Sequence, residues 1–273
     1  MTQIKLKMKT IKTITTMNTI KTIKTMNTMK TLKLTFAFIL ALTMNVFAQN
    51  PNNDPSLAGK SLLDADDHVL IMIDHEGQMA LSVQSIDIQT LRNNVGLIAG
   101  TSKLFNVSTI VTTVAERSFS GPVFPEIKEY YGDESKYIDR TTMNSWEDKR
   151  IVEAVKKTGL KRIVLAGLWT EICITLPALS ALEDGYEVYA ITDASGGVSK
   201  EAHDMAVARM IQAGVVPITS MQYLLELHRD WARAGKYVEV TNLAKRYGGA
   251  YGLGIDYIST MRAWDKEGGD KKH

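Results

Sequence analysis

Residues 162–174 read RIVLAGLWTEICI, and this stretch decides the fold and the chemistry to look for. It begins with a short apolar run that ends at Gly167, which is typical of a buried strand. Apolar residues then recur at helical spacing from Cys173 to Leu182, which predicts a helix directly after the strand. Cys173 is therefore predicted in the first turn of a helix, at the carboxyl end of a parallel strand. Open α/β sheets bind their ligands at that edge.

Cys173 is the only cysteine among the 273 residues. The unpaired N–H groups and the dipole of a helix N-terminus lower the pKa of a thiol, and the thiolate is the reactive form. The alternative interpretation is a small, inert core side chain. A single cysteine cannot form an internal disulfide, and an unpaired thiol in an oxidising compartment is a liability unless it is used or fully buried. Both interpretations stay open on these grounds.

Residues 1–48 are predicted to lie outside the fold. They hold eight lysines and no acid. The first part is a low-complexity basic extension of repeated Met-Lys-Thr and Ile-Lys-Thr units. The second part is typical of a secretory signal peptide, with an apolar core at 34–46 and a cleavage site before Gln49. This core is shorter than the roughly 20 residues of a membrane-spanning helix. We therefore expect a periplasmic or secreted protein without membrane contact after signal cleavage.

The charge balance changes once these residues are set aside. The whole chain has 32 basic and 30 acidic residues, but beyond position 48 only 24 basic residues face all 30 acids. An acidic domain of this kind gives no support to nucleic-acid binding. The remaining length of about 225 residues fits one α/β domain with a sizeable core.

The chain divides into a polar linker at 49–66, one domain at 67–235 and a C-terminal arm at 236–273. In the domain, strand-like runs alternate with helical patterns, which predicts a doubly wound, Rossmann-like α/β fold with a parallel sheet covered by helices on both faces. The arm is rich in Gly and Tyr; it is either a disordered tail or, as we favour, an arm that packs on a neighbouring subunit. The predicted strands are 68–73, 107–114, 136–139, 162–166, 187–191 and 215–218, and the predicted helices are 87–105, 148–158, 173–183, 200–213 and 221–233.

Two charged residues are predicted at the same edge of the sheet as Cys173. Asp74 is the first acid after the apolar run 68–73, and a half-buried carboxylate at a strand end can accept a proton. Arg140 follows a short extended piece, and a cation there would stabilise a thiolate beside Asp74. The alternatives are a loop-capping Asp74 and a solvated surface Arg140. His75 and Glu76 are further candidates, but a strand that ends at Ile73 would leave them on the turn after Asp74.

These positions and their surroundings resemble the isochorismatase-like cysteine hydrolases, and within that family the YcaC-like subgroup. The resemblance covers roughly residues 62–235, with the motifs in the expected order. They are Ile73-Asp74-His75, Asn144-Ser145-Trp146, Thr170-Glu171-Ile172-Cys173, Pro177-Ala178-Leu179-Ser180-Ala181, Thr192-Asp193-Ala194-Ser195-Gly196 and Glu226-Leu227-His228-Arg229-Asp230-Trp231.

The resemblance implies an isochorismatase-like hydrolase fold and a catalytic triad of Asp74, Arg140 and Cys173. Arg140 replaces the lysine that is usual in the family, and a guanidinium keeps its proton, so proton transfer would fall to Asp74. Cys173 would attack a small amide or ester. A cis peptide is implied at Trp169–Thr170, with the N–H groups of Thr170 and Cys173 as oxyanion hole. The resemblance also implies a small-molecule substrate, no cofactor and a homo-oligomer.

The predictions for the substrate pocket and for metals are separate from the triad. Phe119, Asn144, Trp146 and Trp169 are candidates for the pocket, with core or subunit contact as the alternative. Related nicotinamidases bind a metal through histidines at the place that residues 113–119 take here, and these contain no histidine, so no metal is expected. Two other functions remain open: a vinyl-ether hydrolase that does not use Cys173, and a catalytically silent binding or assembly protein.

Overall fold

The computed structural model describes residues 54–231 and 235–266. The predicted basic extension and signal peptide at 1–48, and the first part of the predicted linker, lie outside these ranges. Within the described part of the chain, no helix is long and apolar enough to cross a membrane.

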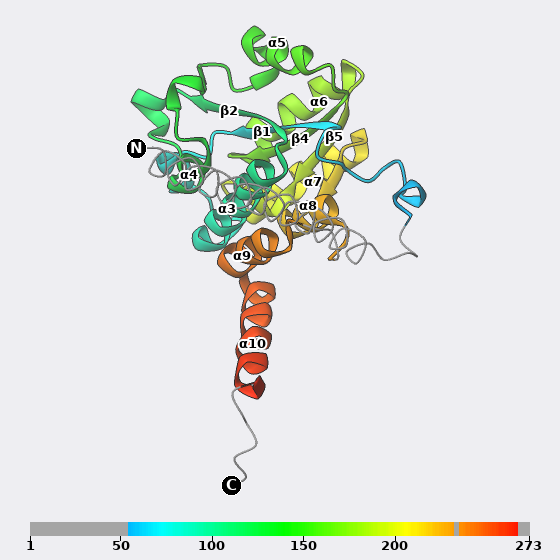
Figure 1. Ribbon diagram of the computed structural model, residues 1–273. Helices are drawn as coiled ribbons and strands as arrows, with labels where there is room; N and C mark the ends of the chain where they lie inside the picture. The colour runs from blue at the N-terminus through cyan, green and yellow to red at the C-terminus, as the bar shows by residue number, and fades with distance from the viewer. Residues whose placement is uncertain (1–53, 232–234, 267–273) are drawn as a thin grey trace, which may run out of the picture. The chain divides into compact units, whose positions relative to one another are not determined.

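The domain is built on a six-stranded sheet in which all neighbouring strands are parallel (Figure 1). The spatial order β3-β2-β1-β4-β5-β6 is that of a doubly wound sheet, so the predicted fold class is confirmed. The strands are β1 (His68–Ile73), β2 (Ser108–Val114), β3 (Ile138–Arg140), β4 (Arg162–Gly167), β5 (Glu187–Ile191) and β6 (Val216–Ile218).

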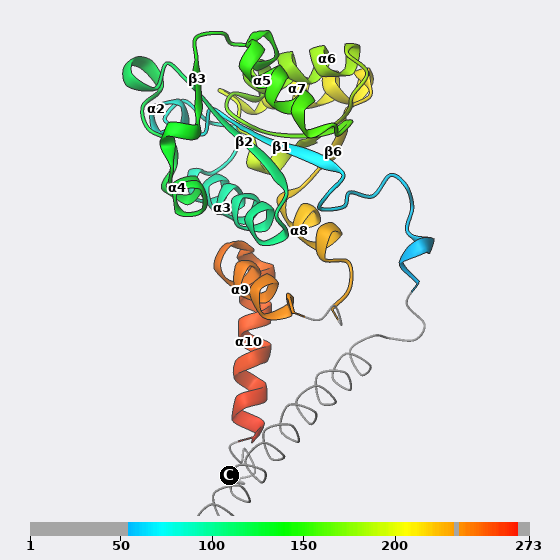
Figure 2. The same cartoon turned by 45° about the horizontal axis from the view of Figure 1, so that its top comes forward.

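Helices cover both faces of the sheet. The longer ones are α3 (Ile88–Phe105), α4 (Pro125–Tyr131), α5 (Lys149–Thr158), α6 (Thr175–Glu183), α7 (Lys200–Ala213), α8 (Ser220–His228), α9 (Tyr237–Tyr247) and α10 (Gly249–Lys266). One face carries α3, α4 and α8, and the other carries α5, α6 and α7 (Figure 2). Short turns complete the chain: η1 (Pro55–Leu57), α2 (Gly77–Ala80), η2 (Glu116–Ser120), η3 (Glu134–Lys136), η4 (Ser145–Glu147), η5 (Thr170–Ile174) and η6 (Thr192–Ala194).

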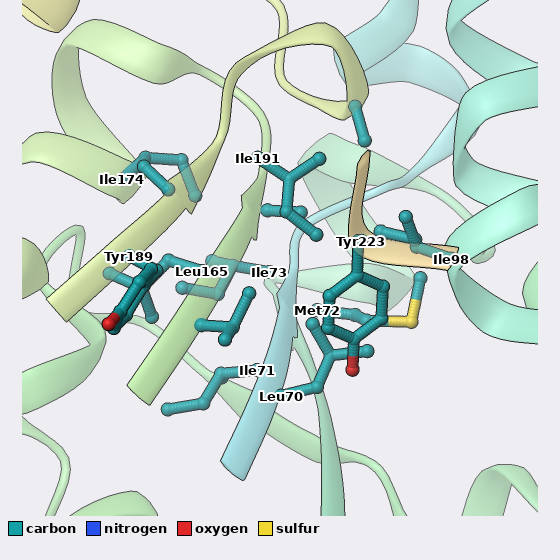
Figure 3. Close-up of a cluster of buried hydrophobic side chains, with 14 of the residues drawn as sticks. Leu70, Ile71, Met72, Ile73, Ile98, Leu165, Ile174, Tyr189, Ile191 and Tyr223 are labelled. Atoms are coloured by element: carbon teal, nitrogen blue, oxygen red, sulfur yellow. The ribbon is translucent and has the colours of Figure 1, made fainter. Parts of the chain in front are cut away.

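The central strand β1 is buried over its whole length. Successive side chains of a strand point to opposite faces of the sheet. Leu70 and Met72 accordingly lie on the side of Tyr223 from α8, whereas Ile71 and Ile73 lie on the opposite side (Figure 3). Because helices bury both faces, the strands appear in the sequence as continuous apolar runs rather than as alternating ones.

The strand order reverses between β1 and β4. From there β2 and β3 follow on one side, and β5 and β6 on the other. The helices that follow β1 and β4 cover opposite faces, and doubly wound folds place their ligand crevice at the carboxyl ends of the two strands at such a reversal. Asp74 directly follows β1, Cys173 lies in η5 after β4, and Arg140 is the last residue of β3.

All the predicted strands and helices are present, with small shifts at their ends. Gly159, Gly185 and Gly214 lie directly after or near the ends of α5, α6 and α7, and they have left-handed φ angles of 73°, 81° and 108°. The helix predicted at 221–233 stops at His228, because Arg229 takes a left-handed φ of 57°. Four helices of the described residues were not predicted: the short α2 and α4, and α9 and α10 in the C-terminal arm.

Both flanking segments contribute to the domain. In the predicted linker, Leu63 is fully buried and its N–H donates to Glu226 Oε1 at 2.7 Å, so the domain begins before residue 67. In the predicted arm, α9 packs on α3 of the same chain. Gly96 permits this approach, since a Cβ there would lie only 2.6 Å from the Tyr247 ring. The first half of the arm is therefore part of this chain's own fold.

Gly167 is required by the contact between β4 and β1. It is paired with Ile73, and a Cβ at this position would overlap the Ile73 carbonyl oxygen. We expect Gly167→Ala to lower the free energy of unfolding by about 1–3 kcal/mol, the usual cost of overpacking a buried site. Urea unfolding measures this. The control is Gly254→Ala on α10, where a Cβ meets no atom. Equal stability of the two variants would contradict the close contact.

Candidate active site

The structure brings Asp74, Arg140 and Cys173 together at the carboxyl edge of the sheet. Arg140 Nη2 donates to Asp74 Oδ2 at 2.6 Å, and neither side chain is accessible to solvent. The Cys173 thiol is 4% exposed and interacts with the Asp74 carboxyl. A buried carboxylate, a buried guanidinium and a thiol therefore share one dry site.

Asp74 reaches this position because the chain turns sharply as it leaves β1. Its φ of 55° is left-handed, which is uncommon for a residue other than glycine. The backbone is fixed on both sides of the strand: the Asp74 N–H donates to the Thr112 carbonyl at 3.0 Å, and the Leu168 N–H donates to the Ile73 carbonyl at 3.0 Å. The backbone that carries the Asp74 carboxyl is thus bonded to the segments on both sides of β1.

Arg140 is held by its backbone and by two partners of its side chain. Its carbonyl accepts the Ala115 N–H at 2.9 Å, which ties the end of β3 to the end of β2. The guanidinium donates to Asp74 and, through Nη1, to the Thr142 carbonyl. Nε is buried and has no hydrogen-bond partner. One donor of this buried cation is therefore still available to a ligand.

Cys173 lies in the π-helical turn η5 rather than in a regular first turn of α6. The turn is fixed from several sides. Thr175 Oγ1 donates to the Thr170 carbonyl at 2.8 Å, and Thr170 Oγ1 hydrogen-bonds with His203 Nδ1 of α7 at 2.8 Å. His203 thus attaches the turn that bears the thiol to α7.

The predicted oxyanion hole is not formed by free N–H groups. The Thr170 N–H donates to the Gly196 carbonyl at 2.9 Å, and the Cys173 N–H donates to the Trp169 carbonyl at 2.8 Å. Both donors are consumed by the backbone bonds that shape η5. The cis peptide is also placed differently: it joins Leu168 to Trp169, one residue before the implied position.

The pKa values in the site correct a second expectation. Burial raises the pKa of Cys173 to about 12, and the neighbouring Asp74 charge adds to the rise. The lowered thiol pKa expected from the helix N-terminus is therefore wrong, because the thiol is buried beside a carboxylate. Burial also raises the pKa of Asp74, to about 6, although Arg140 opposes this rise. At neutral pH the thiol is protonated and Asp74 is ionised.

Glu76 is a further ionisable residue at this edge, and the sequence left it as a candidate on the turn outside the triad. It is fully buried, and its Oε2 accepts the Val114 N–H at 3.0 Å. Burial and the nearby charges of Asp74 and Asp139 raise its pKa to about 8. Its position two residues after Asp74 was visible in the sequence, but its burial depends on tertiary contacts such as the bridge to Val123.

Two of the predicted pocket residues lie together near the thiol-bearing turn. The rings of Phe119 and Trp169 meet edge to face, with centroids 6.5 Å apart. Phe119 belongs to η2 and is 62% exposed, while Trp169 precedes η5 and donates its indole N–H to the Met79 carbonyl at 3.1 Å. They form an aromatic contact between the turns after β2 and β4.

The other two predicted pocket residues have hydrogen-bond partners on α6 and at its end. Trp146 donates its indole N–H to Asp184 Oδ2 at 2.8 Å and packs edge to face on Tyr186, just before β5 begins. Asn144 caps η4 and bonds to Ser180 of α6 at 3.1 Å. Both residues attach η4 to α6 and the turn that follows it, which is the core contact given as the alternative to a pocket role.

The described residues contain no group of three or more His, Cys, Asp or Glu side chains placed to hold a metal ion. The site chemistry that the structure offers is that of the thiol, the two buried carboxyls and the guanidinium.

Comparison with known proteins identifies the family. Residues 68–222 match the isochorismatase domain. The chain belongs to the isochorismatase family. It is 39% identical to the probable hydrolase YcaC of Escherichia coli over 170 residues, which cover 62% of this chain and 81% of YcaC. The resemblance stated from the motifs is therefore confirmed, and the chain is a hydrolase of this family.

Solved structures of two YcaC proteins agree with this assignment. The YcaC structure from Pseudomonas aeruginosa, with hexane-2,5-diol and covalent acrylamide, is 33% identical, with a TM-score of 0.69 over 74% of this chain and 99% of that one. The E. coli YcaC structure, described as an octameric hydrolase of unknown specificity, is 35% identical, with a TM-score of 0.69 over 75% of this chain and 99% of that one.

The buried Glu76 makes stability depend on pH. Folding raises its pKa from the ordinary 4.5 to about 8, so the native state holds this proton more tightly than the unfolded chain does. Its contribution to stability therefore falls as the pH rises through this interval. We expect Glu76→Gln to gain stability relative to the wild type between pH 5 and pH 9, as measured by urea unfolding. The control Glu153→Gln, exposed on α5, should show a constant difference. A constant difference for Glu76→Gln as well would contradict the raised pKa.

Proposed function

We propose that the protein is an exported cysteine hydrolase that cleaves a small amide or ester at a C–N or C–O bond. The observation that carries this proposal is the buried cluster of Asp74, Arg140 and Cys173 at the point where the strand order reverses. Ligand crevices of doubly wound sheets lie at this point. A thiol beside a carboxylate supplies the nucleophile and the base that acyl transfer needs.

In the first half of the reaction, the Cys173 sulfur attacks the substrate carbonyl while its proton passes to Asp74. The carboxylate is suited to this because its pKa is raised to about 6, which makes it a stronger base than an ordinary aspartate. The thiol keeps its proton until a substrate arrives, since burial raises its pKa to about 12. Before attack, the pair thus holds one proton that either group can carry.

In the second half, protonated Asp74 gives its proton to the leaving amine or alcohol as the C–N or C–O bond breaks. The acyl group is then a thioester on Cys173. Asp74, ionised again, takes a proton from a water molecule that attacks this thioester. The acid product leaves, and the proton returns to the sulfur. No cofactor enters these steps, and all proton transfers use one carboxyl.

Arg140 acts through its charge. It offsets the negative charge that the thiolate or the tetrahedral intermediate brings into a dry site, where electrostatic effects are strong. Its buried, unpartnered Nε–H is the donor that we assign to the developing oxyanion. This replaces the Thr170 and Cys173 N–H groups, which already have carbonyl partners.

A solved relative supports a nucleophile in this fold. The P. aeruginosa YcaC structure contains covalent acrylamide. Acrylamide is an electrophile that thiolates attack readily, and this chain has a single thiol, at Cys173. The aromatic pair of Phe119 and Trp169 is suited to line the approach for the apolar part of a substrate.

The proposal predicts that Cys173→Ala loses hydrolysis of every small amide or ester that the wild type cleaves. We expect Asp74→Asn to lose about 10²–10⁴-fold in kcat/KM, the usual contribution of a general base. A panel of small amides and esters, followed by product release at pH 7.5, measures both. Circular dichroism checks that the variants fold. Hydrolysis retained by Cys173→Ala would contradict the proposal and favour vinyl-ether chemistry that does not use the thiol.

We further propose that the protein is a homo-oligomer in which α10 packs on a second copy. The relative from E. coli is described as octameric. On α10, Leu253, Tyr257 and Trp264 are 64–70% exposed and fall on one side of the helix, with Met261 beside them. An apolar stripe of this kind is usual where a partner covers it.

This assembly predicts that charges on the stripe lower the mass of the particle. We expect the double variant Tyr257→Lys, Met261→Lys to elute as a smaller species with unchanged secondary structure. Light scattering after size exclusion measures the mass. The matched control, Ser259→Lys, lies on another side of α10 and should leave the mass unchanged. Equal mass of the wild type and the double variant would exclude α10 from the interface.

Export is proposed from the sequence features of residues 1–48 alone, namely the basic region, the apolar core and the small residue before Gln49. It places the hydrolase in the periplasm or outside the cell, where small amides and esters can reach it directly.

A further inference from the structure

Glu76 is a buried acid that the proposed reaction does not use. Its side chain is not accessible to solvent. Oε2 accepts the Val114 N–H, while Oε1 is buried without a hydrogen-bond partner. Burying a carboxyl with one unsatisfied oxygen costs free energy, and groups of this kind often have a functional role.

The strand order fixes where the Glu76 carboxyl lies relative to the reacting pair. Because Oε2 binds the N–H of Val114, the last residue of β2, the carboxyl lies at the carboxyl end of β2. Asp74 follows β1, and Cys173 follows β4. The sheet order is β2-β1-β4, with neighbouring strands about 4.8 Å apart. Asp74 therefore lies between Glu76 and Cys173.

This order makes a charge on Glu76 act unequally on the two reacting groups. Asp74 and Cys173 share one proton, so the negative charge of the pair sits either on the carboxylate or on the sulfur. Repulsion weakens with distance, and a charge at β2 repels negative charge on Asp74 more strongly than on the thiol one strand further away. An ionised Glu76 thus favours the arrangement with protonated Asp74 and a thiolate.

We propose that Glu76 is a positioning residue for the shared proton: when ionised, it repels the charge of Asp74 and moves the Cys173 proton onto Asp74, which activates the thiol. The effect is electrostatic, and the proton that Glu76 loses goes to solvent. This inference rests on the proposed function, because it gives Cys173 the role of nucleophile.

The surroundings of Glu76 set the pH at which this occurs. Burial, with the charges of Asp74, Asp139 and Glu116, raises its pKa to about 8. Arg140 Nη2 pairs with Asp74 Oδ2 at 2.6 Å, and within the described residues no ion pair joins Arg140 to Glu76. We therefore expect Glu76 to activate the Cys173 thiol at mildly alkaline pH. The other titratable or charged side chains on the neighbouring segments are His75, next to Glu76 in the chain, Arg117 on η2 and Arg140 on β3.

The test is the rate at which iodoacetamide alkylates Cys173 between pH 5 and pH 9.5, in the wild type, Glu76→Gln and the control Glu153→Gln. Mass spectrometry of the Cys173 peptide follows the single thiol of the chain. We expect the wild-type rate to rise as Asp74 ionises near pH 6, to level off, and to rise again by about threefold or more around pH 8. Threefold corresponds to about half a pKa unit. Glu76→Gln should keep the first rise and lack the second.

Each other outcome has a definite meaning. A second rise that persists in Glu76→Gln, or one that is absent from the wild type, would overturn the role of Glu76 while leaving the nucleophile in place. A thiol that is inert at every pH would overturn the proposed function, and this inference with it. Thermal melts at pH 6 and pH 9 ensure that rates are compared between folded proteins. The glutamine keeps the size of the side chain and an oxygen for the Val114 N–H, so a fold defect alone would change the rate at both pH values.

Discussion

The buried ion pair between Arg140 and Asp74 is the interaction on which the site depends. Its 2.6 Å contact joins the end of β3 to the end of β1, across the intervening β2. Neither charge has access to water, and an unpaired charge in such a place costs several kcal/mol. Each residue therefore fixes the other, and the three-residue edge strand β3 gains an anchor in the centre of the sheet.

The same burial determines the chemistry of the thiol. A dry site raises the energy of each negative charge, so the pKa values of both Cys173 and Asp74 rise. A single cation can offset one negative charge well but not two. The resting pair thus keeps a proton, and the thiolate forms only when Asp74 can accept it. Arginine at position 140 suits this arrangement because it supplies charge without exchanging protons.

The turn that bears the thiol shows how the fold distributes its polar groups. In η5 the N–H groups of Thr170 and Cys173 are used to shape the turn, and the Thr170 hydroxyl binds His203. Arg140 Nε, by contrast, is a buried donor without a hydrogen-bond partner in the described part of the chain. Backbone hydrogen bonds thus hold Cys173 in place, while the charge of the Arg140 side chain acts on the negative charge in the site.

The sequence by itself determined the fold class and the positions of the strands. It also placed Asp74, Arg140 and Cys173 together at the carboxyl edge of the sheet. Continuous apolar runs, helix-end glycines and the strand-end positions of these residues are local signals, and the carboxyl ends of parallel strands always meet at one edge. Only the tertiary structure decided the contacts of Trp146 and Asn144, which attach η4 to α6, and the burial of Glu76. It also decided the sign of the thiol's pKa shift. The physical reason is that burial and charge at a site depend on which distant segments cover it, and the spacing of residues along the chain does not contain this information.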